Sequence, residues 1–362
     1  MKPIDLREVE RVLVIMLRHH GDVLLTSPVF GALKHRFPHL EIDALVYGDT
    51  SPMLANHPAI AEIHCIDRSW RKAGLAAQAR GIAGLLRRLS RRRYNLTVHM
   101  SVHWFGAWVN RVLRPRYALV PDFQKAKRSG RLWRGSFTHF YPYRAGPHKH
   151  MVAKNLDALR FLGIDPGEPE SRLVLRPVEA AYARARALLS EAGLGAGRFV
   201  AVHPTSRWLF KCWREEAMAQ VLDHLAAAGW PAVLTAAPDK MELEMTQRIL
   251  SACRRARPVN LAGKLQLQEL AALIDLASLH IGVDSAPMHI AAAMQTPCVA
   301  LFGPSEAAEW GPWMSAHRVI SSRDFPRPPG ELVSDPLYRH SLDNVPVEAV
   351  IRAVDEMLPR RD

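Results

Sequence analysis

RVLVIMLRHHGD, residues 11–22, is the stretch that decides the fold class of this chain. Residues 11–17 contain a continuous apolar run from Val12 to Leu17, which is typical of a strand buried on both faces of a parallel sheet. The run ends in a turn at Gly21, and the apolar spacing that follows predicts a helix from about Leu24 to Arg36. A buried strand that leads through a turn into a helix indicates an α/β fold with a parallel sheet.

The same alternation continues to about residue 100 and then meets an irregular region, 101–149, which interrupts it. The further elements expected in this half are strands at 41–47, 64–67 and 94–100 and helices at 76–92 and 151–162. The segment IDPGEPE (164–170) has two prolines, a glycine and three acids, and we interpret it as a linker.

After the linker the alternation restarts, which predicts a second α/β domain. The expected strands are 199–204, 231–237, 259–263, 279–284 and 298–303, and the expected helices are 178–192, 214–228, 240–254, 266–277, 287–294 and 346–358. Ligands of open α/β sheets bind beyond the carboxyl ends of the strands, so we expect the substrate cleft between the two domains.

Length and composition agree with two folded domains. The chain has 362 residues, 48% of them hydrophobic and 23% charged, which excludes disorder as its main state. It contains no apolar run of 18 residues, and its start does not have the pattern of a secretory signal. The four cysteines lie 41 or more residues apart, without metal-ligand spacing, as expected of reduced thiols in a cytosolic protein.

The positive charge is concentrated in one block. The net charge is +13, but residues 71–150 alone hold 18 Lys or Arg and one acid, Asp122, so that block carries +17. Such a block indicates an anionic partner: nucleic acid, a membrane surface or a phosphorylated substrate. A solvated basic face without a specific role is the alternative.

Asp22 is the first candidate for chemistry, because it follows the first strand directly. A carboxylate at the carboxyl end of a strand is placed to act as a general base. Helix capping is the alternative, since aspartate caps helices well without any chemistry.

HPTSRWLFKCW (203–213) follows the first strand of the second half and offers the hydroxyls of Thr205 and Ser206 and the cation of Lys211. Hydroxyl and backbone donors with one ammonium suit a phosphate. A solvated loop lysine is the alternative for Lys211.

GVDSAPMHIAAAM (282–294) predicts a strand that runs through Asp284 and Ser285 into a helix near Pro287. The start of such a helix is an anion site, to which His289 would add a donor unless it is a packing residue. Neither GxGxxG nor GxxxxGK[ST] occurs, which argues against an NAD-dependent dehydrogenase. Two anion-binding loops and one carboxylate are what transfer from a nucleotide diphosphate donor requires.

Four segments, which follow one another along the whole chain, are RHHGDVLLTSPVFGALKHRFP (18–38), HMVAKNLDALRFLGI (150–164), HPTSRWLFKCW (203–213) and GVDSAPMHIAAAMQTPCVALFG (282–303). Together they resemble the bacterial lipopolysaccharide core heptosyltransferases of glycosyltransferase family 9, and most closely the heptosyltransferase III subgroup.

The resemblance implies a GT-B fold, in which two Rossmann-like domains face each other across a cleft. We therefore expect an acceptor-binding domain at 1–165, a donor-binding domain at 175–345, and a C-terminal helix at 346–362 that crosses back to the first domain. It also implies inversion at the anomeric carbon of ADP-L-glycero-D-manno-heptose without a metal or other cofactor.

Carried over residue by residue, the resemblance gives Asp22 the role of catalytic base and Lys211 a place at the donor phosphates. The other residues that it places at the donor are Thr205, Ser206, Asp239, Leu265, Asp284, Ser285, Ala286 and His289. Ser285-Ala286 stands where the family often has Thr-Gly, which keeps the backbone donors but alters the hydroxyl contact.

The acceptor implied by the family is the phosphorylated inner core of lipopolysaccharide, at the inner face of the cytoplasmic membrane. Subgroup likeness predicts transfer of the third, branching heptose onto the second, with heptosyltransferase II activity on the first heptose as the alternative. Arg128, Arg131 and Arg134 recur every three residues and, if helical, would share one face for the anionic acceptor. The helix within 71–93 would either lie partly on the membrane or cover the sheet with a basic outer face.

A nucleic-acid-binding protein is the alternative from another class, suggested by the basic block and its interleaved aromatic residues. No recognised nucleic-acid module occurs in the sequence, so we expect no nucleic-acid partner.

Overall fold

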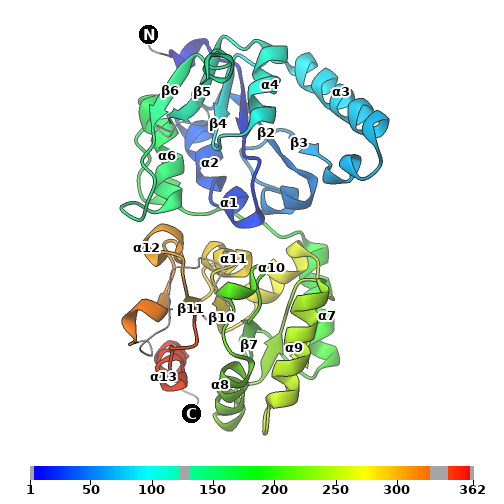
Figure 1. Ribbon diagram of the computed structural model, residues 1–362, viewed down its shortest axis with the longest axis vertical. Coiled ribbons are helices and arrows are strands. Elements are labelled where there is room, and N and C mark those ends of the chain that lie inside the picture. The colour runs from blue at the N-terminus through cyan, green and yellow to red at the C-terminus, as the bar shows by residue number, and fades with distance from the viewer. Residues whose placement is uncertain (1–3, 123–129, 327–340, 359–362) are drawn as a thin grey trace. The chain divides into compact units, whose positions relative to one another are not determined.

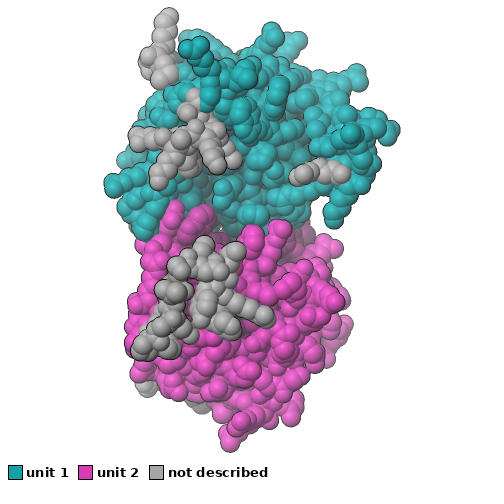
Figure 2. Space-filling model, in the orientation of Figure 1, with its two compact units in different colours: residues 1–176 teal, residues 177–362 magenta. Residues whose placement is uncertain are grey.

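The computed structural model describes residues 4–122, 130–326 and 341–358. The chain divides into two compact units, residues 1–176 and 177–362 (Figure 1, Figure 2). Each unit is built around its own six-stranded parallel sheet, so the predicted α/β class is confirmed.

The sheet of the first unit has the strand order β3-β2-β1-β4-β5-β6. Its central strand β1 (Arg11–Ile15) is the apolar run at the start of the chain, and it lies in parallel between β2 (Glu41–Tyr47) and β4 (Leu96–His99). The outer strands are β3 (Ile63–Ile66), β5 (Tyr117–Asp122) and β6 (His139–Pro142). Four of the five β1 residues are buried, as a strand covered on both faces requires.

Helices of the first unit pack on this sheet through apolar faces. Leu85 and Leu89 of α3 (Leu75–Arg92) and Val109 of α4 (Trp104–Leu113) join Leu13 and Ile15 of β1 in one core cluster. The remaining elements are η1 (Leu6–Glu8), α1 (His20–Leu24), α2 (Ser27–Arg36), η2 (Gly48–Met53), η3 (Arg68–Arg71), α5 (Arg131–Arg134), α6 (Met151–Phe161) and η5 (Pro169–Ser171).

Two expectations for this unit are wrong. The helix predicted from about Leu24 to Arg36 is two helices, because Pro28 has no N–H to continue the hydrogen-bond ladder and the Thr26 hydroxyl donates to the carbonyl of Val23 at 2.6 Å. The region 101–149 continues the alternation with α4, β5, α5 and β6. Its short apolar runs, divided by arginines, conceal that pattern in the sequence.

The sheet of the second unit has the order β12-β11-β10-β7-β8-β9. Its strands are β7 (Val200–His203), β8 (Ala232–Leu234), β9 (Val259–Asn260), β10 (Leu279–Val283), β11 (Cys298–Phe302) and β12 (His317–Ser321). The helical elements are α7 (Glu179–Glu191), η6 (Leu209–Lys211), α8 (Glu215–Ala227), α9 (Lys240–Ala252), α10 (Leu267–Asp275), α11 (Ala286–Met294), α12 (Ala307–Trp310), η7 (Ser322–Asp324) and α13 (Val347–Met357).

Both sheets share one topology, which fixes where ligands can bind. In each, the chain starts at a central strand, builds outward to one edge and then returns to build the other, so the order reverses between β1 and β4 and between β7 and β10. Ligands of open α/β sheets bind outside the carboxyl ends of the strands at such a reversal. The loops that follow β1, β7 and β10 therefore occupy the favoured positions.

The boundary between the units falls six residues beyond the segment 164–170 that we expected as the linker. The chain up to Arg176 stays with the first unit, because Val174 donates its N–H to the Ser27 hydroxyl and Asn56 donates to the carbonyl of Arg176. Helix α13 packs against α8, β11 and β12 of the second unit. That the C-terminal segment also crosses to the first unit stays a prediction. No helix in the described part of the chain is both long and apolar enough to span a bilayer.

Asp43 of strand β2 forms an ion pair with Arg92, the last residue of helix α3. Asp43 of β2 is fully buried and accepts from the guanidinium of Arg92 at 2.7 and 3.0 Å and from the Tyr94 hydroxyl at 2.6 Å. Burial by itself raises the pKa of Asp43, but hydrogen bonds from His64, Arg92 and Tyr94 outweigh it and hold that pKa below its usual value.

We predict that Asp43→Ala lowers the free energy of unfolding by about 1–3 kcal/mol at pH 7, because Arg92 and the Tyr94 hydroxyl lose a buried acceptor while Glu41 still pairs with Arg92. Since folding lowers the pKa of Asp43, its contribution is present above about pH 4 and is lost as the pH falls through the folded-state value. Urea denaturation at pH 7 and pH 3 measures both. Glu62→Ala removes a more exposed acid of the same cluster and is the control, expected to cost about 1 kcal/mol or less.

Candidate functional site

The loop that follows β7 holds both predicted hydroxyls in buried positions. The Thr205 hydroxyl donates to Oε2 of Glu242 at 2.7 Å, and the Ser206 hydroxyl accepts the N–H of Trp208 at 3.3 Å. Each of the two buried hydroxyls therefore has a hydrogen-bond partner, as buried polar groups require. The loop is thereby fastened before its last turn, η6, which ends at Lys211.

Lys211 forms an ion pair with Asp284, which follows the neighbouring strand β10. The Lys211 ammonium lies 2.6 Å from Oδ2 of Asp284, and the two side chains are 22% and 7% exposed. An ammonium so enclosed does not fit the alternative of a solvated loop lysine. The pair joins the two candidate anion loops at the strand reversal of the second sheet.

Ser285 and Ala286 form the start of α11. Ser285 is the N-cap residue, its hydroxyl donates to the carbonyl of Val283 at 3.3 Å, and Ala286 and Pro287 open the helix. The N–H groups of a first turn and the helix dipole favour an anion there. His289 is buried, as the packing alternative expects, and its contact with a donor stays a prediction.

The carboxylate of Asp239 caps the start of helix α9. Its Oδ1 accepts the N–H of Met241 at 3.0 Å and that of Glu242 at 3.4 Å, which fixes the start of α9. Leu265 is half-buried in the connection from β9 to α10. The structure therefore gives Asp239 a structural task, and the predicted contacts of Asp239 with ribose and of Leu265 with adenine stay predictions.

Glu242 is a site residue that sequence reasoning missed. It is buried, and its Oε2 accepts from the Thr205 hydroxyl and, at 3.3 Å, from the N–H of Ala237. The ring of His203 lies 4.0 Å from the same oxygen, and burial lowers the pKa of His203 to about 4, which leaves this ring neutral near pH 7. Asp239 and Glu242 stand at the spacing of a capping motif, so the sequence could indicate the helix start but not the contact with Thr205.

Asp22 lies in the first turn of α1, at the strand reversal of the first sheet. Its Oδ2 accepts the N–H of His19 at 3.2 Å, which makes Asp22 part of the cap, and Arg18 lies 3.4 Å from its Oδ1. The side chain is 12% exposed. Asp22 therefore does cap the helix, as the alternative expects, but from the third helical position and not from the N-cap, and its side chain is not fully buried.

Polar groups from the segments that follow β2 and β3 contact this turn. His20 contacts the carbonyl of Asp49 at 3.0 Å, and Arg68 pairs with the Asp49 carboxylate at 2.6 Å and reaches the carbonyl of Arg18 at 3.4 Å. The Arg68 guanidinium also stacks on the ring of Tyr47. Sequence reasoning missed Arg68, because only the adjacency of the β1, β2 and β3 loops brings it beside Asp22's turn.

The structure describes two of the three arginines predicted to bind the acceptor. Arg131 and Arg134 lie in the one-turn helix α5, and Arg134 is 3.4 Å from Asp122 and stacks on Phe140. Arg128 lies outside the described residues.

One group of three potential metal ligands occurs in the described ranges, formed by Asp43, Glu62 and His64. The carboxylate of Asp43 is already taken by Arg92 and Tyr94, and the group is not at the candidate loops. The residues that we place at the donor therefore include no such cluster.

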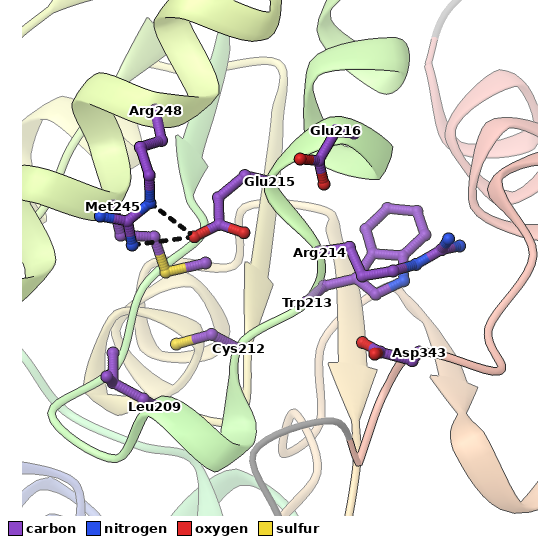
Figure 3. Close-up of a pocket in the computed structure, with 9 residues that line it drawn as sticks. All are labelled: Leu209, Cys212, Trp213, Arg214, Glu215, Glu216, Met245, Arg248 and Asp343. Carbon is purple, nitrogen blue, oxygen red and sulfur yellow. Dashed lines mark hydrogen bonds and ion pairs between the residues drawn. The ribbon is translucent and has the colours of Figure 1, made fainter.

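A pocket of about 290 Å³ opens beside the start of α8 (Figure 3). Arg248 of α9 crosses one side of it and donates to the Glu215 carboxylate at 3.0 and 2.9 Å. Leu209 and Cys212 come from the segment that also carries Lys211, but none of the predicted donor or acceptor residues lines this pocket. We therefore place the candidate site at the loops themselves.

Comparison with known proteins identifies the family. The model of glycosyltransferase family 9 (heptosyltransferase) matches residues 82–331. Lipopolysaccharide heptosyltransferase 3 of Escherichia coli is 37% identical over 95% of this chain and 98% of that protein.

Solved structures share the fold. A family 9 glycosyltransferase of Veillonella parvula superposes with a TM-score of 0.82 at 22% identity, over 96% of this chain and 97% of that one. The E. coli heptosyltransferase WaaC with ADP gives 0.73 at 19% identity, over 96% and 99%. The two parallel six-stranded sheets with flanking helices match these GT-B structures, which confirms the predicted fold class.

We predict that Glu242→Ala lowers the free energy of unfolding by about 1–3 kcal/mol, because the Thr205 hydroxyl and the Ala237 N–H lose their acceptor. It should also weaken ADP binding, measured by calorimetry, since the loop of Thr205 is no longer held. Glu244→Ala, on an exposed position of the same helix, is the control and should change neither quantity. An unchanged ADP affinity in folded Glu242→Ala would show that Glu242 serves stability alone.

Proposed function

The chain belongs to glycosyltransferase family 9, the heptosyltransferases, and from this premise we propose that it moves heptose from ADP-L-glycero-D-manno-heptose to the inner core of lipopolysaccharide. The observation that carries the proposal is the pair of polar loops joined by Lys211 and Asp284 at the strand reversal of the second sheet. Likeness to heptosyltransferase 3 supports transfer of the third heptose onto the second.

The donor diphosphate is held, in this proposal, by the loops of the second unit. Thr205 and Ser206 belong to the first loop. The backbone of Ser285 and Ala286 forms the start of helix α11, which favours an anion. Lys211 is already ordered by Asp284, so it contacts a phosphate without the entropy cost of fixing a free side chain. Asp239, Leu265 and His289 complete the proposed donor set.

The reaction is a single displacement. Asp22 takes the proton of the acceptor hydroxyl as its oxygen bonds to the anomeric carbon, and the bond from that carbon to ADP breaks, with inversion. The transition state resembles an oxocarbenium ion, as in glycoside cleavage. Lys211 and the start of α11 stabilise the charge that develops on ADP. The proposal uses no metal, so EDTA is included in every assay below.

The acceptor is anionic, and the basic block of the first unit supports this assignment. We assign the acceptor side to Arg131, Arg134 and Arg128, and add Arg68 because it lies beside the turn of Asp22. We further propose that the enzyme acts in the cytoplasm, bound peripherally to the inner face of the membrane that carries the acceptor.

Purified protein given ADP-heptose and core acceptors that end at the first or the second heptose tests the function. Mass spectrometry and NMR then locate the new linkage. We expect transfer to the two-heptose acceptor. Transfer to the one-heptose acceptor alone would assign heptosyltransferase II, and no transfer to either would overturn the proposal.

We predict that Asp22→Asn lowers kcat by about 100-fold or more, the value of a general base, while ADP affinity stays within a few-fold. Asparagine keeps an oxygen to accept the His19 N–H, so the cap of α1 survives. Steady-state kinetics and calorimetry measure the two effects. Near-full turnover of Asp22→Asn would reduce Asp22 to a helix cap.

Lys211→Ala should act on both quantities, weakening donor binding and lowering kcat about tenfold or more, because the cation contacts charge that grows in the transition state. The variant also leaves Asp284 buried without its partner. Lys211→Met/Asp284→Asn removes both charges together and separates the loss of fold from the loss of the cation. Parent-like kinetics in the double variant would contradict the assigned role.

A further inference from the structure

An apolar stripe runs along the outer face of α4. Trp104, Trp108 and Val112 recur every four residues, and they are 45%, 61% and 47% exposed. Residues four apart lie on one face of a helix. The opposite face of the same helix is buried through Ala107, Val109 and other residues, so the stripe is not a misplaced core face.

Helix α5 extends this surface. Arg111 of α4 donates to the Ser136 hydroxyl at 2.8 Å and to the carbonyl of Leu132, and Ala107 shares a core cluster with Trp133. These contacts hold α5 against α4, and Leu132 on α5 is 71% exposed. We call Trp104, Trp108, Val112 and Leu132 the aromatic ridge.

The segment that carries α3 and α4 is strongly basic, although Asp122 lies near α5, where it pairs with Arg134. Residues 75–121 hold nine arginines and neither Asp nor Glu. Helix α3 packs beside α4, and the two cover the same side of the unit (Figure 1). Leu85 and Leu89 face the core, while Arg80, Arg87, Arg88 and Arg91 of α3 are exposed.

We infer that the aromatic ridge and the arginines beside it are the surface by which this enzyme docks on an anionic lipid bilayer. The inference rests on the proposed function, since that function places the acceptor in a membrane. Tryptophan prefers the boundary between headgroups and acyl chains, and arginines nearby are attracted by acidic headgroups. Helix α3 covers the sheet and supplies charge, and α4 and α5 supply the inserted side chains.

Charge and side-chain chemistry select this partner. Two copies of this chain that met through the ridge would bring two arginine-rich surfaces with a large excess of positive charge together, and these repel. A nucleic acid would stack on the tryptophans but gains nothing from Val112 and Leu132. Aliphatic and indole side chains within an arginine field fit a lipid interface, where both kinds of group find partners.

Flotation with vesicles tests the inference on the full chain without any substrate. We expect binding to phosphatidylcholine vesicles that contain about 30% phosphatidylglycerol, weak binding to pure phosphatidylcholine, and loss of binding as NaCl is raised, because screening removes the attraction. Trp104→Ser/Trp108→Ser should weaken binding to the anionic vesicles about tenfold or more, since the two indoles that would insert into the bilayer are lost. Arg87→Ser/Arg91→Ser should weaken it as well and reduce its dependence on salt.

Trp208→Ser is the matched control for the vesicle assay, because Trp208 is 46% exposed but lies in the second unit. Its binding to anionic vesicles should equal that of the parent. Parent protein that does not float, or Trp104→Ser/Trp108→Ser protein that floats like the parent, would overturn the inference. So would a dimer, detected by sedimentation, that the same double variant dissociates.

Activity then separates this inference from the proposed function. With a deacylated, water-soluble acceptor, Trp104→Ser/Trp108→Ser should turn over like the parent, whereas with acceptor embedded in anionic vesicles its rate should fall in parallel with its binding. If the parent transfers no heptose yet floats through the ridge, the proposed function fails and the docking surface stands. If the parent transfers heptose but does not float, the proposed function stands and the docking surface fails.

Discussion

The ion pair of Lys211 and Asp284 is the interaction on which the proposed donor site depends. It joins two loops that are 73 residues apart in the chain and that meet only because β7 and β10 are neighbours. A carboxylate as buried as that of Asp284 is costly without a partner, so the lysine is needed for the fold of the loops as well as for an anion. Lys211 thus joins the two loops and also holds a cation at a fixed position, where the proposed donor would meet it.

The two units have the same strand topology, and this explains where the polar loops of each unit lie. Each unit places a polar loop at the reversal of its strand order, but the two loops differ in chemistry. The second unit offers hydroxyls, an ammonium and a helix start, which suit a diphosphate, whereas the first offers the carboxylate of Asp22. Helix caps position both sets: Asp22 caps α1, and Asp239 caps the helix that presents Glu242 to Thr205. Residues that stabilise helix ends are therefore the same ones that orient the site.

Much of the fold could be predicted from sequence, because β1, β10 and β11 are short, mainly apolar segments with turn residues after them. β12 was missed, since HRVIS at 317–321 mixes charge with apolar residues at the sheet edge. The loops of Asp22, Lys211 and Asp284 could be placed because each directly follows a predicted strand. Glu242 and Arg68 could not, because their contacts join segments 37 and 50 residues apart and depend on side-chain direction.

The central claim is a direct displacement in which Asp22 activates the acceptor and no bond forms between the sugar and the protein. The stereochemistry of the product tests this claim most directly. NMR of the purified product gives the anomeric configuration of the new linkage, to be compared with that of the donor. A single displacement predicts the opposite configuration in the product. The same configuration in donor and product would require a second displacement, and it would contradict the account.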